Sequence, residues 1–212
     1  MQVIPLSESS YILRDFEVDA YLLARSIETA CIPGIEEVVP SVNTVGIFVD
    51  PDQFQLRSIN VVRIIESMKG AHWRVPILFN GSDLNEICKN LVMSADEVCA
   101  LFCSATYTVM SIGFLPGFPY LKGLPREFMQ LTRRPVPRIH VPKGSIGIAA
   151  GQAGIYPKES PGGWQLIATT PLTIADPDKP YFPINPGDTI RFYEVGQEQY
   201  KSLKNRRLGD NG

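Results

Sequence analysis

Three side chains that donate hydrogen bonds, at least two of them cationic, lie within six residues of the sequence: Arg138, His140 and Lys143. A strand through this stretch places Arg138 and His140 on one face, because side chains two residues apart in a strand point the same way. The guanidinium group is a planar fork that matches a carboxylate. The spacing therefore predicts a face that binds a small anion, with Arg138 as its main ligand.

Neutral polar groups and aromatic rings flank this basic stretch. The polar groups are Gln152, Tyr156 and Ser160, and the rings are Phe118, Tyr120 and Trp164. Apolar walls with a few convergent polar groups are the usual composition of a small-molecule pocket. We therefore predict a substrate-binding groove from these residues. The alternative is that the charges are solvated on the surface and that Trp164 belongs to the core.

Other kinds of site find little support in the sequence. With only two histidines, His72 and His140, and no Gly-x-Ser-x-Gly turn, no catalytic nucleophile is predicted. Cys99 and Cys103 have the i, i+4 spacing that metal ligands also use, but without a second pair they are predicted to be buried thiols rather than zinc ligands. The glycine-rich stretch 144–151 is followed by no predicted helix, so a phosphate-binding turn is not expected.

The elements that carry the predicted groove are rich in proline and glycine. Thirteen of the 18 prolines lie between Pro116 and Pro186, and nine of the 17 glycines lie in residues 113–164. Long helices are excluded there, and short β-rich runs recur between turn signals. This pattern predicts a closed or half-closed β-barrel over residues 106–197, followed by a polar tail over 198–212.

The N-terminal residues alternate between strand and helix periodicities. Strands are predicted over 10–16, 35–39, 44–49 and 73–79, and helices over 20–30 and 51–69. In the second helix, Ile59, Val62, Ile65 and Met68 form one apolar stripe. The order βαββαβ predicts a ferredoxin-like α+β domain over residues 1–80.

A helical connector is predicted over residues 81–105. Asp83 with Glu86, and Ser94 with Glu97, have the spacing of capping boxes at the starts of two short helices. A DNA-binding helix-turn-helix is the alternative, but the second helix carries no Lys or Arg to reach phosphates or bases. The connector is therefore predicted to be structural.

Composition and charge narrow the class of protein. Hydrophobic residues make up 44% of the 212 residues, and the formal net charge is -2, so no basic field for nucleic acid or anionic membrane is expected. No apolar run reaches membrane-spanning length, and the first ten residues do not resemble a signal peptide. A cytoplasmic protein with four reduced cysteines is predicted.

Several motifs in the C-terminal half resemble one family in order and spacing. They are Thr-Tyr-Thr-Val at 106–109, Gly-Phe-Leu-Pro-Gly-Phe-Pro-Tyr-Leu at 113–121, Pro-Arg-Ile-His-Val-Pro-Lys-Gly-Ser at 137–145, Gly-Gln-Ala-Gly-Ile-Tyr-Pro at 151–157, Ser-Pro-Gly-Gly-Trp-Gln-Leu at 160–166, Asp-Pro at 176–177 and Pro-Gly-Asp at 186–188. The chain resembles allophanate hydrolase subunit 1, a family also described as the sporulation-kinase inhibitor KipI and as the B component of the bacterial ATP-dependent 5-oxoprolinase. The sequence departs from the family pattern at Phe102, often His, and at His140, often Arg.

The resemblance implies a cyclophilin-like barrel after a smaller α+β domain, and a partner of the subunit 2 or C type. It implies a subunit, inactive alone, of an amidohydrolase complex that uses ATP and acts on an amide or lactam, most plausibly opening 5-oxoproline to glutamate. The alternative within the family is a regulatory protein that inhibits a sensor histidine kinase. Proline isomerase activity would rest on fold analogy alone.

Overall fold

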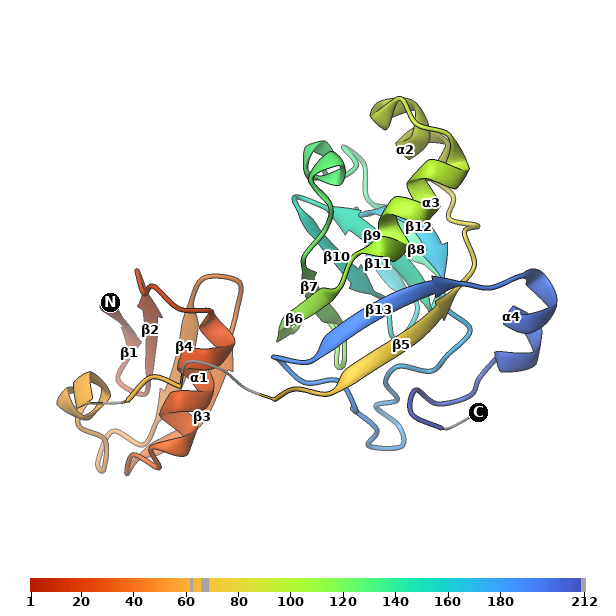
Figure 1. Cartoon of the computed structure of the whole chain (residues 1–212). Helices are drawn as coiled ribbons and strands as arrows, with labels where there is room; N and C mark the ends of the chain where they lie inside the picture. The colour runs from red at the N-terminus through yellow and green to blue at the C-terminus, as the bar shows by residue number, and fades with distance from the viewer. Residues whose placement is uncertain (62, 66–68, 211–212) are drawn as a thin grey trace. The chain divides into compact units, whose positions relative to one another are not determined.

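The computed structural model describes residues 1–61, 63–65 and 69–210, and the chain divides into two compact units, Met1–Gly70 and Ala71–Gly212 (Figure 1). The first unit is coloured red to orange in Figure 1, and the second yellow to blue. The expected first domain ended at residue 80, whereas the structure assigns the strand that begins at His72 to the second unit.

The first unit is an antiparallel sheet in the order β1-β2-β4-β3, with one helix packed on it (Figure 1). Its elements are β1 (Gln2–Ser7), β2 (Ser10–Arg14), α1 (Ala20–Thr29), β3 (Ile35–Pro40), β4 (Val45–Val49) and the 3-10 helix η1 (Leu56–Val61). Leu23 and Ile27 on the apolar stripe of α1 pack against Val45 and Ile47 of β4 in one buried cluster. The predicted helix 20–30 and hairpin 35–49 are confirmed.

The predicted βαββαβ order of the first 80 residues is wrong. The expected sixth element is β5 (His72–Ile77), and it pairs in parallel with β13 (Thr189–Glu194) in the sheet of the second unit. In the first unit, β1 occupies the sheet edge beside β2, a position that the sequence pattern did not predict. The first unit is thus ββαββ in its regular elements.

The helix predicted over 51–69 is also wrong in the part that the structure describes. Only the short η1 forms, and residues 63–65 have no regular structure. Val62 and Met68 of the expected stripe lie outside the described residues. β-branched side chains crowd residues 59–65, and such side chains lower helix propensity because their χ1 freedom is restricted in a helix.

The second unit is built on a seven-stranded sheet in the order β12-β9-β10-β7-β6-β13-β5. The remaining elements of the unit are α2 (Leu84–Leu91), α3 (Ala95–Ser104), β6 (Tyr107–Ile112), β7 (Pro119–Lys122), η2 (Arg126–Gln130), β8 (Arg138–Val141), β9 (Ser145–Ala149), β10 (Gln152–Ile155), β11 (Ser160–Gly162), β12 (Gln165–Thr169) and α4 (Gln197–Leu203). β8 and β11 form a separate two-stranded sheet.

The two edges of the seven-stranded sheet meet, which gives a nearly closed, barrel-like shape. Leu78, directly after β5, exchanges two backbone hydrogen bonds of 2.9 Å with Thr169 at the end of β12. Register shifts in the β6–β7 and β9–β12 pairs mark bulges, which bend strands and help a sheet to curl. The barrel expected from the short, proline-bounded runs therefore forms.

Asp188 fixes the start of the parallel pair β5–β13. It is 4% exposed, and its carboxylate accepts hydrogen bonds from the backbone N–H of Ala71 (2.8 Å), the indole N–H of Trp73 (2.9 Å) and the backbone N–H of Asn185 (2.9 Å). A buried carboxylate needs such donors because desolvation is otherwise costly. The turn predicted at residues 186–188 thus also holds the start of β5, through the bonds of Asp188 to Ala71 and Trp73.

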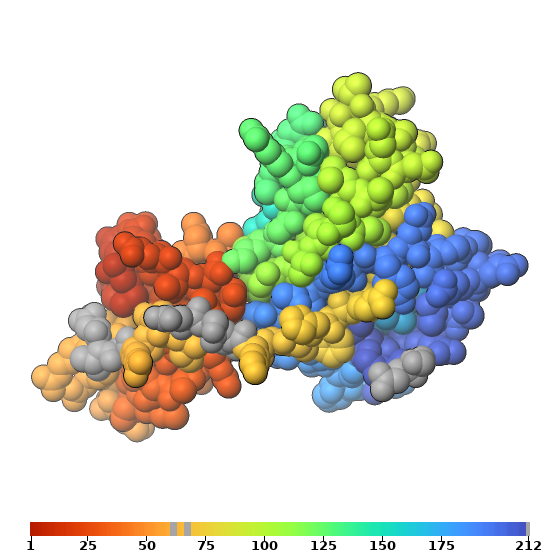
Figure 2. Space-filling model, in the orientation of Figure 1, coloured from red at the N-terminus to blue at the C-terminus, as the bar shows by residue number. Residues whose placement is uncertain are grey.

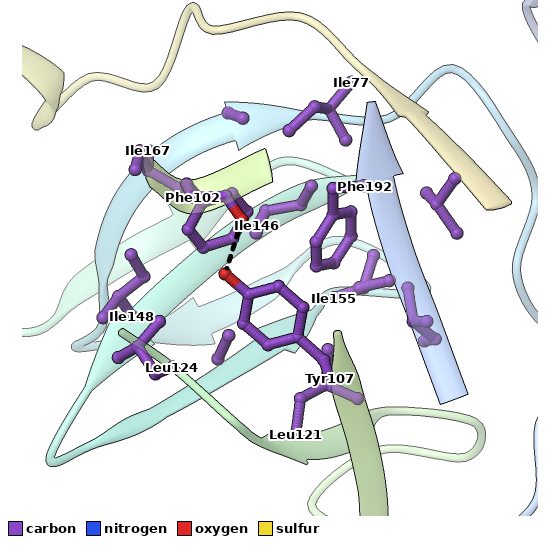
Figure 3. Close-up of a cluster of buried hydrophobic side chains, with 14 of the residues drawn as sticks. Ile77, Phe102, Tyr107, Leu121, Leu124, Ile146, Ile148, Ile155, Ile167 and Phe192 are labelled. Carbon is purple, nitrogen blue, oxygen red and sulfur yellow. Dashed lines mark hydrogen bonds between the residues drawn. The ribbon is translucent and has the colours of Figure 1, made fainter. Parts of the chain in front are cut away.

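An aromatic cluster lies at the centre of the barrel (Figure 3). Phe102 from α3 is fully buried and packs against Tyr107 and Phe192, with ring centroids 5.2 Å away in each case. The hydroxyl of Tyr107 donates to the carbonyl oxygen of Phe102 at 2.9 Å, the dashed line in Figure 3. Isoleucines from four strands, Ile77, Ile146, Ile155 and Ile167, complete this core in the close-up.

Two short helices, α2 and α3, form where the connector was expected, and they lie at the same end of the unit as η2 (Figures 1 and 2). The capping box at Ser94 and Glu97 is confirmed, since both reciprocal hydrogen bonds are present. The one expected at Asp83 and Glu86 is wrong, because the Asp83 side chain makes no cap hydrogen bond. Asp83 instead accepts hydrogen bonds from distant residues of the second unit.

The polar tail predicted over 198–212 is structured in its described part. α4 forms, and Leu208 is buried, with its backbone N–H donating to the Thr173 carbonyl at 3.0 Å. The tail therefore packs on the barrel as far as Leu208. Within residues 1–61, 63–65 and 69–210, no helix has both the length and the apolar character needed to cross a membrane.

Candidate functional site

Five aromatic side chains line a hollow of about 270 Å³ in the second unit. They are Phe114, Phe118, Tyr120, Tyr156 and Trp164; Arg133, Pro137, Pro161, Gly162 and Gly163 complete the lining. Four of the nine residues predicted for a groove, Phe118, Tyr120, Tyr156 and Trp164, are brought together here. We call this site the aromatic hollow.

Phe118 is the centre of the ring packing in the aromatic hollow. Its centroid lies 5.5 Å from that of Phe114, 5.0 Å from Tyr120, 5.1 Å from Tyr156 and 5.6 Å from Trp164, all in edge-to-face contacts. Edge-to-face pairs are the favoured geometry, because the positive ring edge meets the negative face. The walls are therefore held in place before any ligand arrives.

Two glycines make room for these rings. A Cβ atom at Gly154 would lie 2.5 Å from Cζ of Phe118, and one at Gly162 would lie 2.5 Å from the hydroxyl oxygen of Tyr156. Both distances are far below van der Waals contact. The glycine density of this part of the sequence thus reflects close approach of rings to the backbone.

Phe114 forms the exposed rim of the aromatic hollow. Its backbone has φ 66°, in the left-handed region that phenylalanine rarely adopts, and the residue is 59% exposed. A tight loop holds it there: Leu115 N–H donates to the Gly113 carbonyl at 2.8 Å, and Phe118 N–H donates to the Leu115 carbonyl at 3.0 Å. Such strain persists only where the surroundings fix it, and it is common at binding sites.

The two tyrosines of the aromatic hollow are neutral donors at neutral pH. The pKa of Tyr156 is raised to about 12, first by burial and then by the nearby Tyr120, against the opposing effects of Arg133, Arg138 and a backbone hydrogen bond at Trp164. Burial also raises the pKa of Tyr120, opposed by Arg133. Both hydroxyls therefore keep their protons and can donate to a carbonyl or carboxylate oxygen.

Arg133 is the cation that the sequence reasoning missed. It lines the aromatic hollow, its side chain is exposed, and none of the ion pairs in the described part of the chain involves it. Arg133 is the first of two adjacent arginines just before Pro135, a basic pair outside the predicted stretch 138–143. Pro135 restricts the backbone of Arg134, the residue before it, to extended conformations. This restriction is the sequence signal that could have drawn attention to the arginine pair.

Arg138, the predicted anion ligand, lies outside the lining of the aromatic hollow. Its guanidinium is paired with the carboxylate of Asp83 and also donates to the Trp164 carbonyl at 3.3 Å. Asp83 is 3% exposed and also accepts from Arg134 Nη1 at 2.8 Å. Arg138 thus already has a buried carboxylate partner within the chain.

The other predicted polar residues also lie outside the lining. His140 is exposed and its Nδ1 lies 2.9 Å from a carboxylate oxygen of Glu159. Lys143 donates to the Thr173 hydroxyl at 3.1 Å, and the buried Ser160 hydroxyl donates to the Pro161 carbonyl at 3.1 Å. Gln152 begins β10, where it pairs with Ala149. The single groove expected from nine residues is therefore smaller and more aromatic than predicted.

Cys99 and Cys103 are placed on the wall of a second hollow, between α3 and β13, of about 720 Å³. Burial raises the pKa of Cys99 to about 12 and that of Cys103 to about 11, so both thiols are protonated at neutral pH. Since a thiolate is the form that binds metal or attacks electrophiles, the raised pKa values lower the reactivity of both thiols. No cluster of three His, Cys, Asp or Glu side chains suited to a metal ion occurs in the described ranges.

The sequence matches one family model, that of the carboxyltransferase domain, subdomain C and D, over residues 10–183. The chain belongs to this family. It is also 32% identical to the B component of 5-oxoprolinase from Haemophilus influenzae, over 93% of this chain and 100% of the relative. The family resemblance in the sequence motifs is thereby confirmed.

Solved structures with TM-scores above 0.7 show the same fold. The protein TTHA0988 superposes with a TM-score of 0.78 and is 32% identical, over 88% of this chain, which spans 40% of that longer chain. The urea amidolyase of Kluyveromyces lactis superposes with a TM-score of 0.73 at 19% identity, over 94% of this chain and 15% of the other. Chains much longer than this one therefore contain the same fold as one part.

Proposed function

We propose that this chain is a subunit of an ATP-dependent 5-oxoprolinase and that its aromatic hollow binds the lactam substrate. The observation that carries the proposal is one cation, Arg133, beside two neutral phenols and a preformed aromatic wall. The name of the Haemophilus influenzae relative supplies the substrate class. In keeping with the resemblance, we assign the barrel to the cyclophilin-like folds and the protein to the cytoplasm.

The chemistry of 5-oxoproline fits the groups around the aromatic hollow. Its carboxylate needs a cation, and Arg133 replaces Arg138 in this role because the Arg138 guanidinium is engaged by Asp83. Its lactam carbonyl accepts hydrogen bonds, which Tyr120 and Tyr156 can donate. Its methylene groups are apolar and suit the faces of Phe118 and Trp164.

The chain supplies binding rather than the whole reaction. Opening the lactam adds water across the C–N bond and leaves an amine and a second carboxylate, and the family couples this step to ATP hydrolysis. The aromatic hollow has no protonatable nucleophile beyond its two phenols, whose pKa values are raised by burial. We therefore assign nucleotide binding and activation of the carbonyl to the partner of the subunit 2 or C type.

Exposed apolar side chains near the aromatic hollow support docking of that partner. Val136 and Ile139 are each 76% exposed and Phe114 is 59% exposed. From the adjacent loop only Phe114 contributes fully to this exposed surface, since Phe118 is buried and Leu115 is half-buried. Light scattering of the co-purified pair tests assembly, and two independent species would contradict it. Association with a sensor histidine kinase instead would favour the regulatory alternative.

The function is tested by glutamate formation from 5-oxoproline and ATP in the co-expressed complex. Replacing Arg133 by Gln removes a charge-assisted hydrogen bond, so we expect kcat/KM to fall by roughly 10- to 100-fold. Arg126→Gln, which alters an exposed arginine of η2 outside the lining, is the matched control. An unchanged kcat/KM in Arg133→Gln, with assembly intact, would exclude the aromatic hollow as the substrate site.

A further inference from the structure

The segment 132–138 forms one wall of the aromatic hollow without a helix or strand of its own before β8 begins at Arg138. It contributes Arg133 and Pro137 to the lining. Irregular segments hold their shape only through specific contacts, because they lack a ladder of backbone hydrogen bonds. What fixes this segment therefore also fixes the cation of the site.

Each lining residue of the segment is followed directly by an arginine that reaches the same buried carboxylate. Arg134 follows Arg133, and its Nη1 donates to Oδ1 of Asp83 at 2.8 Å. Arg138 follows Pro137, and its Nη2 donates to the same oxygen. The segment is thus held at two points, four residues apart, by one carboxylate.

Asp83 is itself tightly placed. Its second oxygen, Oδ2, accepts from the backbone N–H of Leu166 at 2.7 Å, and its own N–H donates to the Leu166 carbonyl at 3.0 Å. Gly81 lets the loop come this close to β12, since a Cβ there would lie 2.2 Å from the Leu166 carbonyl oxygen. At 3% exposed, the carboxylate is the buried end of both ion pairs.

The segment has one further ion pair, between Arg134 Nη1 and Oε2 of Glu86 at 3.5 Å, and that carboxylate is 60% exposed; its remaining contacts are neutral. Arg134 N–H donates to the Gly163 carbonyl at 2.7 Å, and the Gln165 side chain donates to the Thr132 carbonyl at 2.9 Å. Charge-assisted bonds at a buried acceptor are about twice as strong as neutral ones. Among these contacts, the carboxylate of Asp83 is therefore the strongest restraint.

We propose that Asp83 is a positioning residue, which acts through Arg134 and Arg138 to hold the 132–138 segment and so places Arg133 over the aromatic hollow. This role in substrate recognition rests on the proposed function, whereas the restraint on the segment does not. Asp83 touches no ligand in this arrangement. It determines the position of the Arg133 guanidinium and thereby the affinity for the carboxylate of the substrate.

Hydrogen exchange of the full chain tests the restraint directly. Asp83→Asn keeps the size of the side chain and an oxygen for the Leu166 N–H, but it removes the charge that both arginines require. We expect the protected amides of the segment, above all the Arg134 N–H that donates to the Gly163 carbonyl, to exchange about ten-fold faster or more, while those of β9 and β10 stay protected. Glu86→Gln is the matched control, because Glu86 lies 3.5 Å from Arg134 but is 60% exposed.

Two arginine variants keep the test decisive if Asp83→Asn does not fold. Arg134→Gln and Arg138→Gln each remove one of the two ion pairs, and together they should reproduce the faster exchange. Unchanged protection of residues 132–138 in a folded Asp83→Asn, or in the double arginine variant, would overturn the proposal.

Kinetics of the assembled complex test the consequence for recognition. In Asp83→Asn we expect KM for 5-oxoproline to rise about ten-fold with kcat nearly unchanged, as for loss of a binding contact. In the Arg133→Gln background the same change should add little, because the group that Asp83 positions is already absent. Additive effects would overturn the role in recognition. If the complex turns over no 5-oxoproline, the proposed function fails, and the exchange result still decides the restraint.

Discussion

The second unit contains two aromatic clusters, one closed and one open. In the closed cluster, Phe102 packs against Tyr107 and Phe192 and is fully buried, and the Tyr107 hydroxyl bonds to a backbone carbonyl. In the open cluster, Phe118 is equally buried, but Tyr120 is half-exposed and Arg133 lies at the edge. Ring contacts hold both clusters together: Phe102 stacks on Phe192 and is tilted against Tyr107, whereas the contacts of Phe118 are edge-to-face.

The clusters differ in the surroundings of their polar groups. The only hydroxyl among the closed-cluster rings is satisfied inside the chain, so a ligand would find nothing to bind. In the open cluster, Tyr120, Tyr156 and Arg133 belong to the lining of a hollow, although a backbone hydrogen bond at Trp164 already reaches the Tyr156 phenol. Aromatic content alone therefore does not mark a binding site; the polar groups beside the rings do.

The largest expected effect concerns the closed cluster. Phe102→Ala removes a fully buried ring that contacts four other aromatic rings, and should destabilise the fold by about 3–5 kcal/mol. Denaturant unfolding measures this. Phe114→Ala in the open cluster should cost about 1 kcal/mol or less, because the ring is already 59% exposed. Equal losses in the two variants would break the comparison.

A smaller effect is expected where glycine admits a ring. Gly162→Ala places a methyl group against the Tyr156 hydroxyl, so we expect a loss of about 1–3 kcal/mol through overpacking, together with weaker ligand binding. Gly196→Ala is the control, because a Cβ there meets nothing within 4 Å and should change stability by about 0.5 kcal/mol or less. Thermal unfolding and isothermal titration with 5-oxoproline are the measurements. A stable, ligand-binding Gly162→Ala would show that this close approach is dispensable.

Alkaline titration separates the tyrosines of the two clusters. Burial raises the pKa of Tyr156 to about 12 and that of Tyr107 further. Because the folded pKa values exceed the ordinary value near 10, the folded state favours the protonated phenols. Their contribution to the free energy of unfolding is complete below pH 10 and is lost as pH rises through the folded pKa. Arg133→Gln should raise the pKa of Tyr156, since the cation lowers it, and leave Tyr107 unchanged. Phenolate absorbance in Tyr→Phe variants measures both; an unmoved Tyr156 would place Arg133 away from the hollow.

The smallest expected effect concerns the rate at which cysteines are alkylated. It includes a cysteine at the edge of the closed cluster. Cys103 packs against that cluster, and burial raises the pKa of both Cys99 and Cys103, whereas Cys31 in the first unit is exposed. At pH 8, iodoacetamide should modify Cys31 first and leave Cys99 and Cys103 protected until unfolding. Peptide mass spectrometry gives the order, and early labelling of Cys103 would mean that α3 opens locally.

Periodicity and capping residues in the sequence predicted where helices and strands form better than they predicted which strands pair with each other. The α1 helix, the 35–49 hairpin and the capping box at Ser94 follow from periodicity and capping chemistry within a few residues. The assignment of β5 to the first unit failed, because its true partner, β13, lies far along the chain. Period-2 patterns identify a strand but say nothing about which edge it joins.

Four of the nine residues predicted for a groove lie together in the aromatic hollow. Aromatic residues between tight turns pointed to Phe118, Tyr120, Tyr156 and Trp164, since rings in such a stretch need a folded surface. The prediction of Arg138 as the anion ligand failed, because the sequence does not show whether a cationic side chain is already paired with a carboxylate elsewhere in the chain. Arg138 is neutralised by Asp83, 55 residues away in the chain, and this pairing left Arg133 as the cation beside the hollow.

The parallel pairing of β5 with β13 has a consequence for biosynthesis. It joins His72 to Thr189, 117 residues apart, and Asp188 completes it only after nearly the whole second unit has been made. During synthesis, the edges of β5 and β6 that pair with β13 therefore remain without hydrogen-bond partners until β13 has left the ribosome. Such long-range closure is slow and exposes unpaired strands to aggregation. We expect the nascent chain to depend on chaperones until the last strand arrives.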